Sequence, residues 1–173
     1  MTWPALLAEA RSGSRLRHSP VHGERHWRAV AATGLELARR DGRVDPAICL
    51  AFAVLHDCRR VNEHRDPRHG PAAADVAQSS APLHALLGAD RAGLVAEACL
   101  HHEGGKPRRD QPLIGACFDA DRFTLGRVGT DPDPWFFSVV HHDPDFAEMV
   151  RFAQDATRAP PEWTRLFRLL DAG

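Results

Sequence analysis

One segment restricts the fold of this chain more than any other. Residues 48–55 are apolar on almost every side, and they are followed directly by His56 and Asp57. A helix with this composition is buried in the middle of a protein rather than laid on its surface. Pro46 suits the first turn of such a helix. A charged carboxylate at the end of a core helix needs a buried partner or a metal ion. We therefore expect a core helix with a polar site at its C-terminal end.

The rest of the chain also shows a helical pattern. Apolar residues recur with helical spacing over about 21–40, and Asp41 and Gly42 stop that helix. Loops are expected over 61–70, 103–110 and 126–134. Further helices are expected over about 71–77, 91–102, 112–122, 145–156 and 161–170. Because no alternating strand pattern is present, the sequence predicts one all-α domain, a compact multi-helix bundle, over residues 1–173, with its C-terminal helices within 144–171.

Composition excludes several classes of partner. The formal net charge is -1, so no global field would gather a nucleic acid polymer. Four cysteines without a C-x-x-C pair resemble buried thiols of a reducing compartment. No run approaches the roughly 18–20 apolar residues of a membrane span, and the N-terminus lacks the pattern of a signal peptide. We expect a cytoplasmic protein that does not bind membranes.

Candidate metal ligands gather around the predicted core helix. His22 and His26 are four residues apart, so both can point to the same place from one helix. Imidazole nitrogens and carboxylate oxygens together suit iron, manganese, zinc or cobalt better than calcium. Asp119 and Asp121 are two residues apart and cannot share one helical face. Further ligand types lie at the predicted ends of other helices, at His69, His101 and His102.

The order of these motifs resembles the HD-domain superfamily, in which a His, an adjacent His-Asp pair and a later Asp arise from separate helices. His26, with Arg28 and Val30, looks like the first-ligand helix. The segment 53–57, AVLHD, looks like the motif that names the family, and 120–122, ADR, looks like the closing ligand. The resemblance covers about residues 20–128. It implies an HD-type bundle that is a metal-dependent phosphohydrolase of a small phosphoester or nucleotide. The implied metal ligands are His26, His56, Asp57 and Asp121.

Other histidines match only some members of this superfamily. His69, followed by Gly70, is similar to an additional histidine of some members, and His101-His102 to the paired histidines of others. The resemblance implies that His69, His101 and His102 hold a second metal or orient the phosphate. The cofactor is then one or two divalent transition metal ions, which could be Mn, Fe, Co, Ni or Zn. Asp57 or His101 would transfer protons.

Basic residues near the ligands suggest how a phosphorylated substrate is bound. Guanidinium groups match phosphate oxygens with two parallel hydrogen bonds, and Arg59 and Arg122 follow predicted ligands closely. We expect these two residues and Lys106 to bind substrate. Arg59 belongs to the segment 58–60, CRR, which replaces the usual Gly-Lys after His-Asp. The acidic pair that nucleotide hydrolases of the family often carry on a following helix is also missing, since only Glu63 and Asp66 are present. This second departure favours a branch other than the triphosphate and alarmone hydrolases.

Two other functions fit the same motifs. Some HD-type proteins with extra histidines bind two irons and activate dioxygen, so a di-iron oxygenase is one alternative. The other is a regulatory module that binds a metal and a nucleotide without turnover, which the missing Gly-Lys would favour. The metal complement and oxygen consumption would distinguish an oxygenase from a hydrolase.

Overall fold

The computed structural model describes residues 2–104 and 106–171, and these residues form nine α-helices, two short 3-10 helices and no strand. The predicted all-α class is confirmed. None of the helices in this part of the chain has the length and apolar composition needed to span a membrane. The helices are α1 (Trp3–Ser12), α2 (Glu24–Arg40), α3 (Pro46–Leu55), α4 (His69–Ser79), α5 (Ala81–Leu87), α6 (Ala89–His101), α7 (Pro112–Arg122), η1 (Leu125–Val128), η2 (Pro134–Phe136), α8 (Asp145–Arg158) and α9 (Trp163–Asp171).

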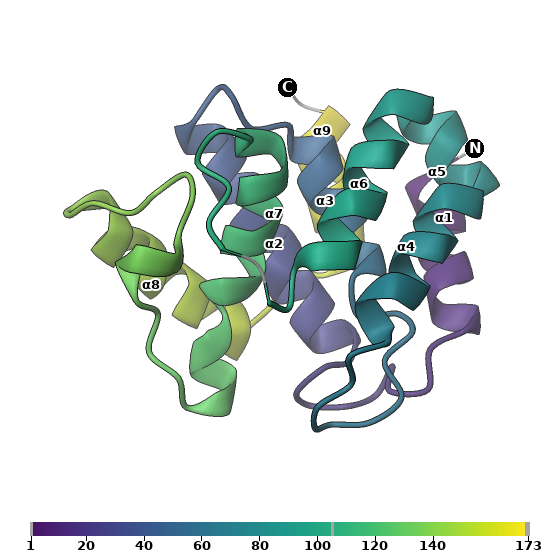
Figure 1. Ribbon diagram of the computed structural model, residues 1–173, viewed down its shortest axis with the longest axis horizontal. Helices are drawn as coiled ribbons and strands as arrows, with labels where there is room; N and C mark the ends of the chain where they lie inside the picture. The colour runs from purple at the N-terminus through teal and green to yellow at the C-terminus, as the bar shows by residue number, and fades with distance from the viewer. Residues whose placement is uncertain (1, 105, 172–173) are drawn as a thin grey trace.

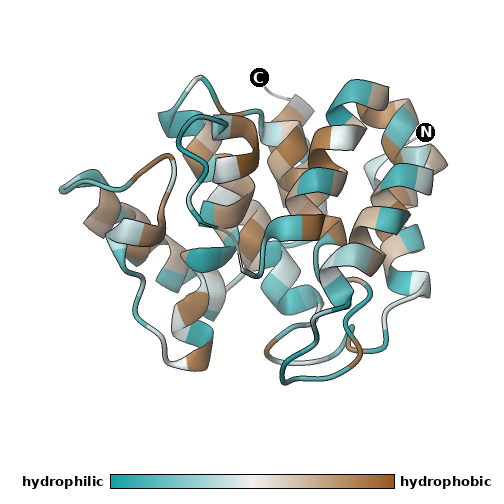
Figure 2. Cartoon of the chain, viewed as in Figure 1, coloured by the Kyte–Doolittle hydropathy of each residue, from teal (hydrophilic) through white to brown (hydrophobic). Residues whose placement is uncertain are grey.

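The core helix α3 forms as the sequence predicts. Asp45 caps it, because its Oδ1 accepts hydrogen bonds from the backbone nitrogens of Ala47 (2.9 Å) and Ile48 (3.2 Å). Pro46 occupies the first turn, and every residue from 48 to 55 is buried. The surrounding helices carry both hydrophobic and hydrophilic residues, as Figure 2 shows. This is the pattern of helices with one face toward a shared core.

The packing around α3 places several helix ends together. Helix α2 packs against α3, α7 and α8, while α6 packs against α3, α4 and α7. In Figure 1, α1, α4 and α5 lie on one side of these central helices and α8 lies on the other. The segments 13–23 and 56–68 lie at the same end of the bundle, so the loop after α3 is next to the loop before α2.

Two helices were not predicted from the sequence. Helix α1 has Pro4 in its first turn and buries Leu6, Leu7 and Ala10 against the core. Helix α5 begins after Ser80, whose hydroxyl oxygen accepts a hydrogen bond from the nitrogen of Leu83 (3.1 Å). Its seven residues are too few for a clear periodic pattern. Other boundaries differ from the predictions by up to three residues, and the largest difference is at the start of α2, which begins at Glu24 rather than at about residue 21.

Candidate metal centre

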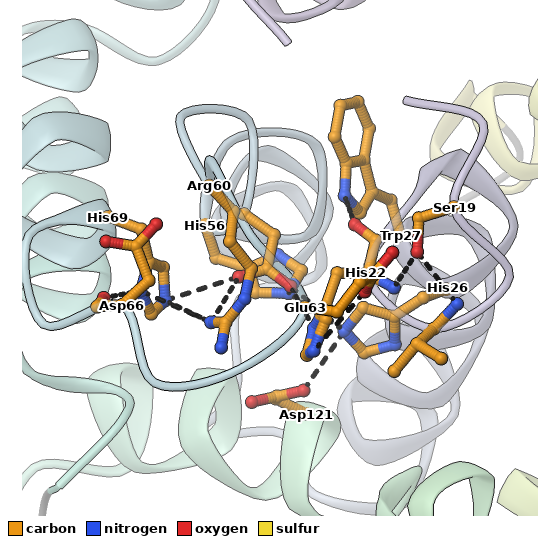
Figure 3. Close-up of polar contacts among 12 residues, drawn as sticks. Ser19, His22, His26, Trp27, His56, Arg60, Glu63, Asp66, His69 and Asp121 are labelled. Carbon is orange, nitrogen blue, oxygen red and sulfur yellow. Dashed lines mark hydrogen bonds and ion pairs between the residues drawn. The ribbon is translucent and has the colours of Figure 1, made fainter. Parts of the chain in front are cut away.

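The predicted ligands meet where five helices end or begin. His26 lies in the first turn of α2, and His56 and Asp57 follow α3. His69 begins α4, His102 follows α6, and Asp121 lies in the last turn of α7. All of these residues except Asp121 are at most 5% exposed. Figure 3 shows the imidazoles of His26 and His56 on the same side of the bundle as the Asp121 carboxylate.

The first cluster consists of His26, His56, Asp57 and Asp121. The Nε2 atoms of His26 and His56 are 3.1 Å apart, and His26 Nε2 lies 3.6 Å from Asp57 Oδ2. Asp121 Oδ1 is 3.3 Å from His26 Nε2. His26, His56 and Asp57 alone already meet the spacing expected of a metal-binding group.

The second cluster consists of Asp57, His69 and His102, which also have the spacing of a metal-binding group. The Nε2 atoms of the two histidines are 3.0 Å apart. Asp57 Oδ1 lies 3.3 Å from His69 Nε2 and 4.0 Å from His102 Nε2. Asp57 therefore presents one oxygen to each cluster.

Backbone hydrogen bonds fix the imidazoles in the state that a metal ligand needs. A carbonyl oxygen can only accept, so each ring that contacts one through Nδ1 donates from that nitrogen and keeps a lone pair on Nε2. This second contact is what orients metal-ligating histidines. The three pairs, each joining a ring to the carbonyl three residues earlier, are His56 with Ala53, His69 with Asp66, and His102 with Cys99.

Burial keeps two of these histidines neutral. It lowers the pKa of His26 to about 3, with a further contribution from the nearby Arg127 guanidinium. Burial also lowers the pKa of His102 to about 4, assisted by the neighbouring His56. Both imidazoles are therefore uncharged at neutral pH, which is the form that binds a metal.

The two cluster carboxylates are held ionised despite their burial. Burial alone would raise the pKa of Asp57, but the adjacent His56 and the hydrogen bond to His22 Nδ1 (3.3 Å) outweigh it and hold this pKa well below its ordinary value. For Asp121, contact with His26 and the charge of Arg127 likewise outweigh burial and lower the pKa.

A metal ion fits this donor set. Among the described residues, Asp121 Oδ1 is buried and has no hydrogen bond of acceptable geometry, although His26 Nε2 lies 3.3 Å away. Arg127 Nη2 lies 3.6 Å from this oxygen as an ion-pair partner. A buried acceptor without a hydrogen bond is still costly, and a metal ion beside it would reduce that cost. Neutral imidazole lone pairs and ionised carboxylates directed to the same place are what a divalent transition metal requires.

Asp119 has a different role from Asp121. Both of its oxygens accept from the nitrogen of Ser138 (2.9 Å each), and Oδ2 also accepts from that of Val139 (2.7 Å). Burial raises the pKa of Asp119 to about 7. Its carboxylate therefore fastens the segment 138–139 to α7 and lies outside both clusters.

A cavity of about 400 Å³ opens above the two clusters. Its lining includes Asp57, Asp121 and the guanidinium-bearing residues Arg60, Arg122 and Arg127. Arg60 is only 7% exposed, and its Nη1 lies 3.6 Å from both Asp57 Oδ1 and Glu103 Oε1. Its other nitrogens donate to the backbone carbonyls of residues 62 and 64, which hold the guanidinium in place. The cavity thus combines a metal-binding floor with three arginine side chains in its lining.

Three sequence-predicted residues lie elsewhere. His101 is exposed and lines a separate surface pocket together with Lys106. The Arg59 guanidinium packs against Gly13, where an added Cβ would lie only 2.0 Å from its Nη1. None of the three lines the cavity over the clusters. We therefore take His101 out of the proposed ligand and proton-transfer set, and Arg59 and Lys106 out of the proposed substrate contacts.

Arg60 and Glu103 were not assigned a role from the sequence, whereas His22 was expected to share one helix with His26. His22 hydrogen-bonds Asp57, Arg60 faces the second cluster, and Glu103 lines the cavity. The expected helix was wrong for His22, because α2 begins at Glu24 and His22 lies in the turn before it. A signal was available for Arg60, because residues three apart in a helical turn lie on the same side and Asp57 is three residues earlier.

A known protein family matches the segment that carries these clusters. The HD domain family model matches residues 23–126, which is more than half of the chain and includes every residue of both clusters. The chain has no match among curated proteins and none among solved structures.

Proposed function

Since the chain belongs to the HD-domain family, we propose that it is a metal-dependent phosphohydrolase that acts on a small phosphoester or nucleotide. The observation that carries this proposal is the position of Asp57. Its two oxygens face two buried clusters of metal-ligand type, at the floor of a cavity that arginine side chains line. A dinuclear site with arginine side chains beside it suits an anionic phosphoryl group.

The ligands divide between two ions in this proposal. His26, His56, Asp57 and Asp121 would hold one ion, and Asp57, His69 and His102 would hold the other. Manganese, iron, cobalt, nickel and zinc all suit nitrogen and oxygen donors. When bound, a divalent ion lowers the pKa of water and polarises a phosphoryl oxygen.

Cavity side chains would bind and orient the substrate. Arg60 is held by backbone carbonyls and faces the second cluster, so it would contact phosphate oxygens. Arg122 also lines the cavity, where its Nη1 donates to the carbonyl of Phe136 (2.6 Å). Because Asp57 presents both oxygens to the clusters, we assign proton transfer to Glu103, whose Oε1 lies beside Arg60 Nη1.

The cavity volume limits the size of the substrate. About 400 Å³ is near the lower end of the volumes of small-molecule sites, which run from about 300 to 1,000 Å³. A small phosphoester fits this space, whereas a nucleic acid polymer would have to lie outside it.

A di-iron oxygenase is the second candidate, and the same shared carboxylate favours it. Two clusters rich in histidine that share Asp57 would also hold two irons. A regulatory module that binds without turnover would use the same residues. These candidates differ in what they consume: a hydrolase needs no dioxygen, an oxygenase does, and a module produces nothing.

The test begins with anaerobic purification and metal analysis. Protein loaded separately with manganese, cobalt, nickel, iron or zinc is then assayed on a phosphoester panel. We expect phosphate release with at least one metal and loss of release with a chelator. No turnover with any metal, together with oxygen consumption by the reduced iron form, would replace the hydrolase with the oxygenase.

Arg60 and its neighbour provide a matched pair of variants. Arg60→Ala is expected to raise KM about 10-fold or more, because it removes charge-assisted hydrogen bonds to phosphate. Arg59→Ala serves as the control, since that side chain packs against Gly13 outside the cavity. An equal effect of the two substitutions would contradict the assignment of Arg60.

A further inference from the structure

Exposed apolar side chains lie in the lining of the cavity and next to it in the sequence. Val128 is 48% exposed, Phe136 is 50% exposed and Trp135 is 71% exposed. Val128 and Phe136 line the same cavity as Asp57, together with the half-buried Leu125. A contiguous exposed apolar patch marks a binding surface more often than isolated apolar residues do. This patch lies directly beside the polar floor of the proposed active site.

The backbone that carries Phe136 is fastened by side chains from other parts of the chain. Arg122 donates to the carbonyl of Phe136, and Arg109 donates to those of Trp135 (3.3 Å) and Phe137 (3.1 Å). Asp119 accepts from the next two backbone nitrogens. The Phe136 ring is therefore presented on a fixed segment, and a preorganised surface binds a ligand with less ordering cost.

Phe137 anchors this segment from below. It is 1% exposed, and its ring lies 4.2 Å from that of Phe123 and 5.0 Å from that of Phe146, measured between centroids. Phe137 thus belongs to the core, whereas the adjacent Phe136 remains half exposed at the cavity. The packing that buries Phe137 therefore does not explain why the Phe136 ring lines the cavity.

Charge in the lining of the cavity is mixed. The exposed Asp131 and Asp133 line the cavity together with Val128 and Phe136, and so do Arg122 and Arg127. Arg122 lies next to Phe136, because its Nη1 donates to the Phe136 carbonyl (2.6 Å). Arg60, by contrast, lies beside the second cluster. The apolar side chains, and not the charge, therefore distinguish this part of the lining from the floor.

We propose that Phe136, with Leu125 and Val128, forms an apolar platform that binds the organic group of the substrate, and that this group is planar and apolar. This inference rests on the proposed function, because the phosphoryl group at the floor places the organic group against the platform. Aromatic faces stack favourably on planar groups beyond the effect of buried area alone. The substrate class is then a phosphomonoester of a planar apolar alcohol.

Trp135 provides an internal comparison. It neighbours Phe136 and is more exposed, but it does not line the cavity. A surface used to dock another protein would depend on Trp135 at least as much as on Phe136. A substrate platform depends on Phe136 and not on Trp135.

Binding of phosphonates tests the platform without turnover, because a carbon–phosphorus bond replaces the ester bond that a phosphohydrolase cleaves. The probes are benzylphosphonate, cyclohexylmethylphosphonate and ethylphosphonate, titrated calorimetrically into the manganese-loaded full chain. We expect benzylphosphonate to bind about 10-fold more tightly than ethylphosphonate, with cyclohexylmethylphosphonate between them. Equal affinities for all three probes, or no binding of any, would overturn the platform.

Variants test whether the preference for benzylphosphonate comes from the Phe136 ring. Phe136→Ala is expected to bring the benzyl-to-ethyl affinity ratio close to one while leaving ethylphosphonate binding unchanged. Phe136→Leu should keep a preference over ethylphosphonate but lose the one between the planar and the saturated ring. Trp135→Ala is the control and should keep both preferences. An unchanged ratio in Phe136→Ala, or the same loss in Trp135→Ala, would contradict the proposal.

The two proposals can fail separately. Protein that shows the benzyl preference but releases no phosphate from any phosphoester would keep the platform and lose the hydrolase. Protein that hydrolyses phosphoesters without any preference among the phosphonates would keep the hydrolase and lose the platform.

Discussion

The two clusters that share Asp57 are built differently. The first lies between α2, α3 and α7 and includes a second carboxylate, Asp121, whose Oδ1 is buried without a hydrogen bond. The second has two histidines and no further carboxylate, and Arg60 and Glu103 lie beside it. Metal sites that serve structure are closed by protein ligands, whereas catalytic sites keep a position open. The comparison indicates that the first cluster would retain its ion more tightly and that the second would face the substrate.

Removal of the shared carboxylate is expected to have the largest effect. Asp57→Ala takes a ligand from both clusters, so both ions should be lost while far-UV circular dichroism stays largely unchanged. His56→Ala should also strongly lower the amount of metal bound at the first cluster. Metal analysis of the purified variants measures this. Unchanged stoichiometry in both variants would show that neither cluster binds metal.

Removal of a ligand from one cluster should separate the two. His102→Ala is expected to lower the metal content from two ions to one, because the first cluster keeps all four of its ligands. His101→Ala is the matched control, since that side chain is exposed and outside both clusters. Loss of both ions in His102→Ala would mean that the clusters do not bind independently.

The neighbouring carboxylates of α7 should respond to substitution in opposite ways. Asp121→Asn is expected to weaken metal binding at the first cluster at least about 10-fold, as loss of a charged ligand or its support commonly does. Asp119→Asn should leave metal binding intact but destabilise the fold by about 1–3 kcal/mol, because it disturbs a buried acceptor of backbone hydrogen bonds. Metal titration and chemical denaturation of both variants would distinguish them, and the reverse pattern would exchange their roles.

The smallest expected effect is a pH dependence of stability through Asp119. Its pKa rises from the ordinary value of 3.8 to about 7 on folding, so the folded state binds more protons between these values. The free energy of unfolding should therefore fall as pH rises from about 4 to about 7, relative to Asp119→Asn. Denaturation of the metal-free proteins across this range measures the difference. A contribution that grows with pH would contradict the raised pKa.

Features set by local sequence were predictable. The Asp45 cap, the proline of the first turn and the apolar composition of 48–55 specify α3 without reference to the rest of the fold. The adjacent His56 and Asp57 then fall at a helix end by necessity. The HD-type resemblance supplied the other ligand helices, and the family match covers the same segment.

It was harder to predict which of two neighbouring residues faces the site, because the rotation of a helix about its axis depends on the helices that pack against it. His102 is buried and His101 exposed, and Arg60 lies in the cavity while Arg59 does not. In α6 the apolar spacing held a usable signal, since Val95 and Ala98 are buried and His102 continues the same helical face. The sequence-based expectation weighed residue types at these positions but not their helical phase.

The contacts that hold the wall of the cavity could not be predicted from the sequence, although Arg122 was expected to bind substrate and lines this cavity. The segment 135–139 has no regular pattern, and it is held by Arg109, Asp119 and Arg122, which are up to 28 residues away in the sequence. Contacts of this kind depend on how α7 packs, which no local feature of the segment encodes.

Anomalous diffraction from crystals of the manganese-loaded protein would test the shared role of Asp57 most directly. Two anomalous peaks are expected on opposite sides of the Asp57 carboxylate. One peak should lie among His26, His56 and Asp121, and the other beside His69 and His102. A single peak, or peaks that do not contact Asp57, would contradict the account.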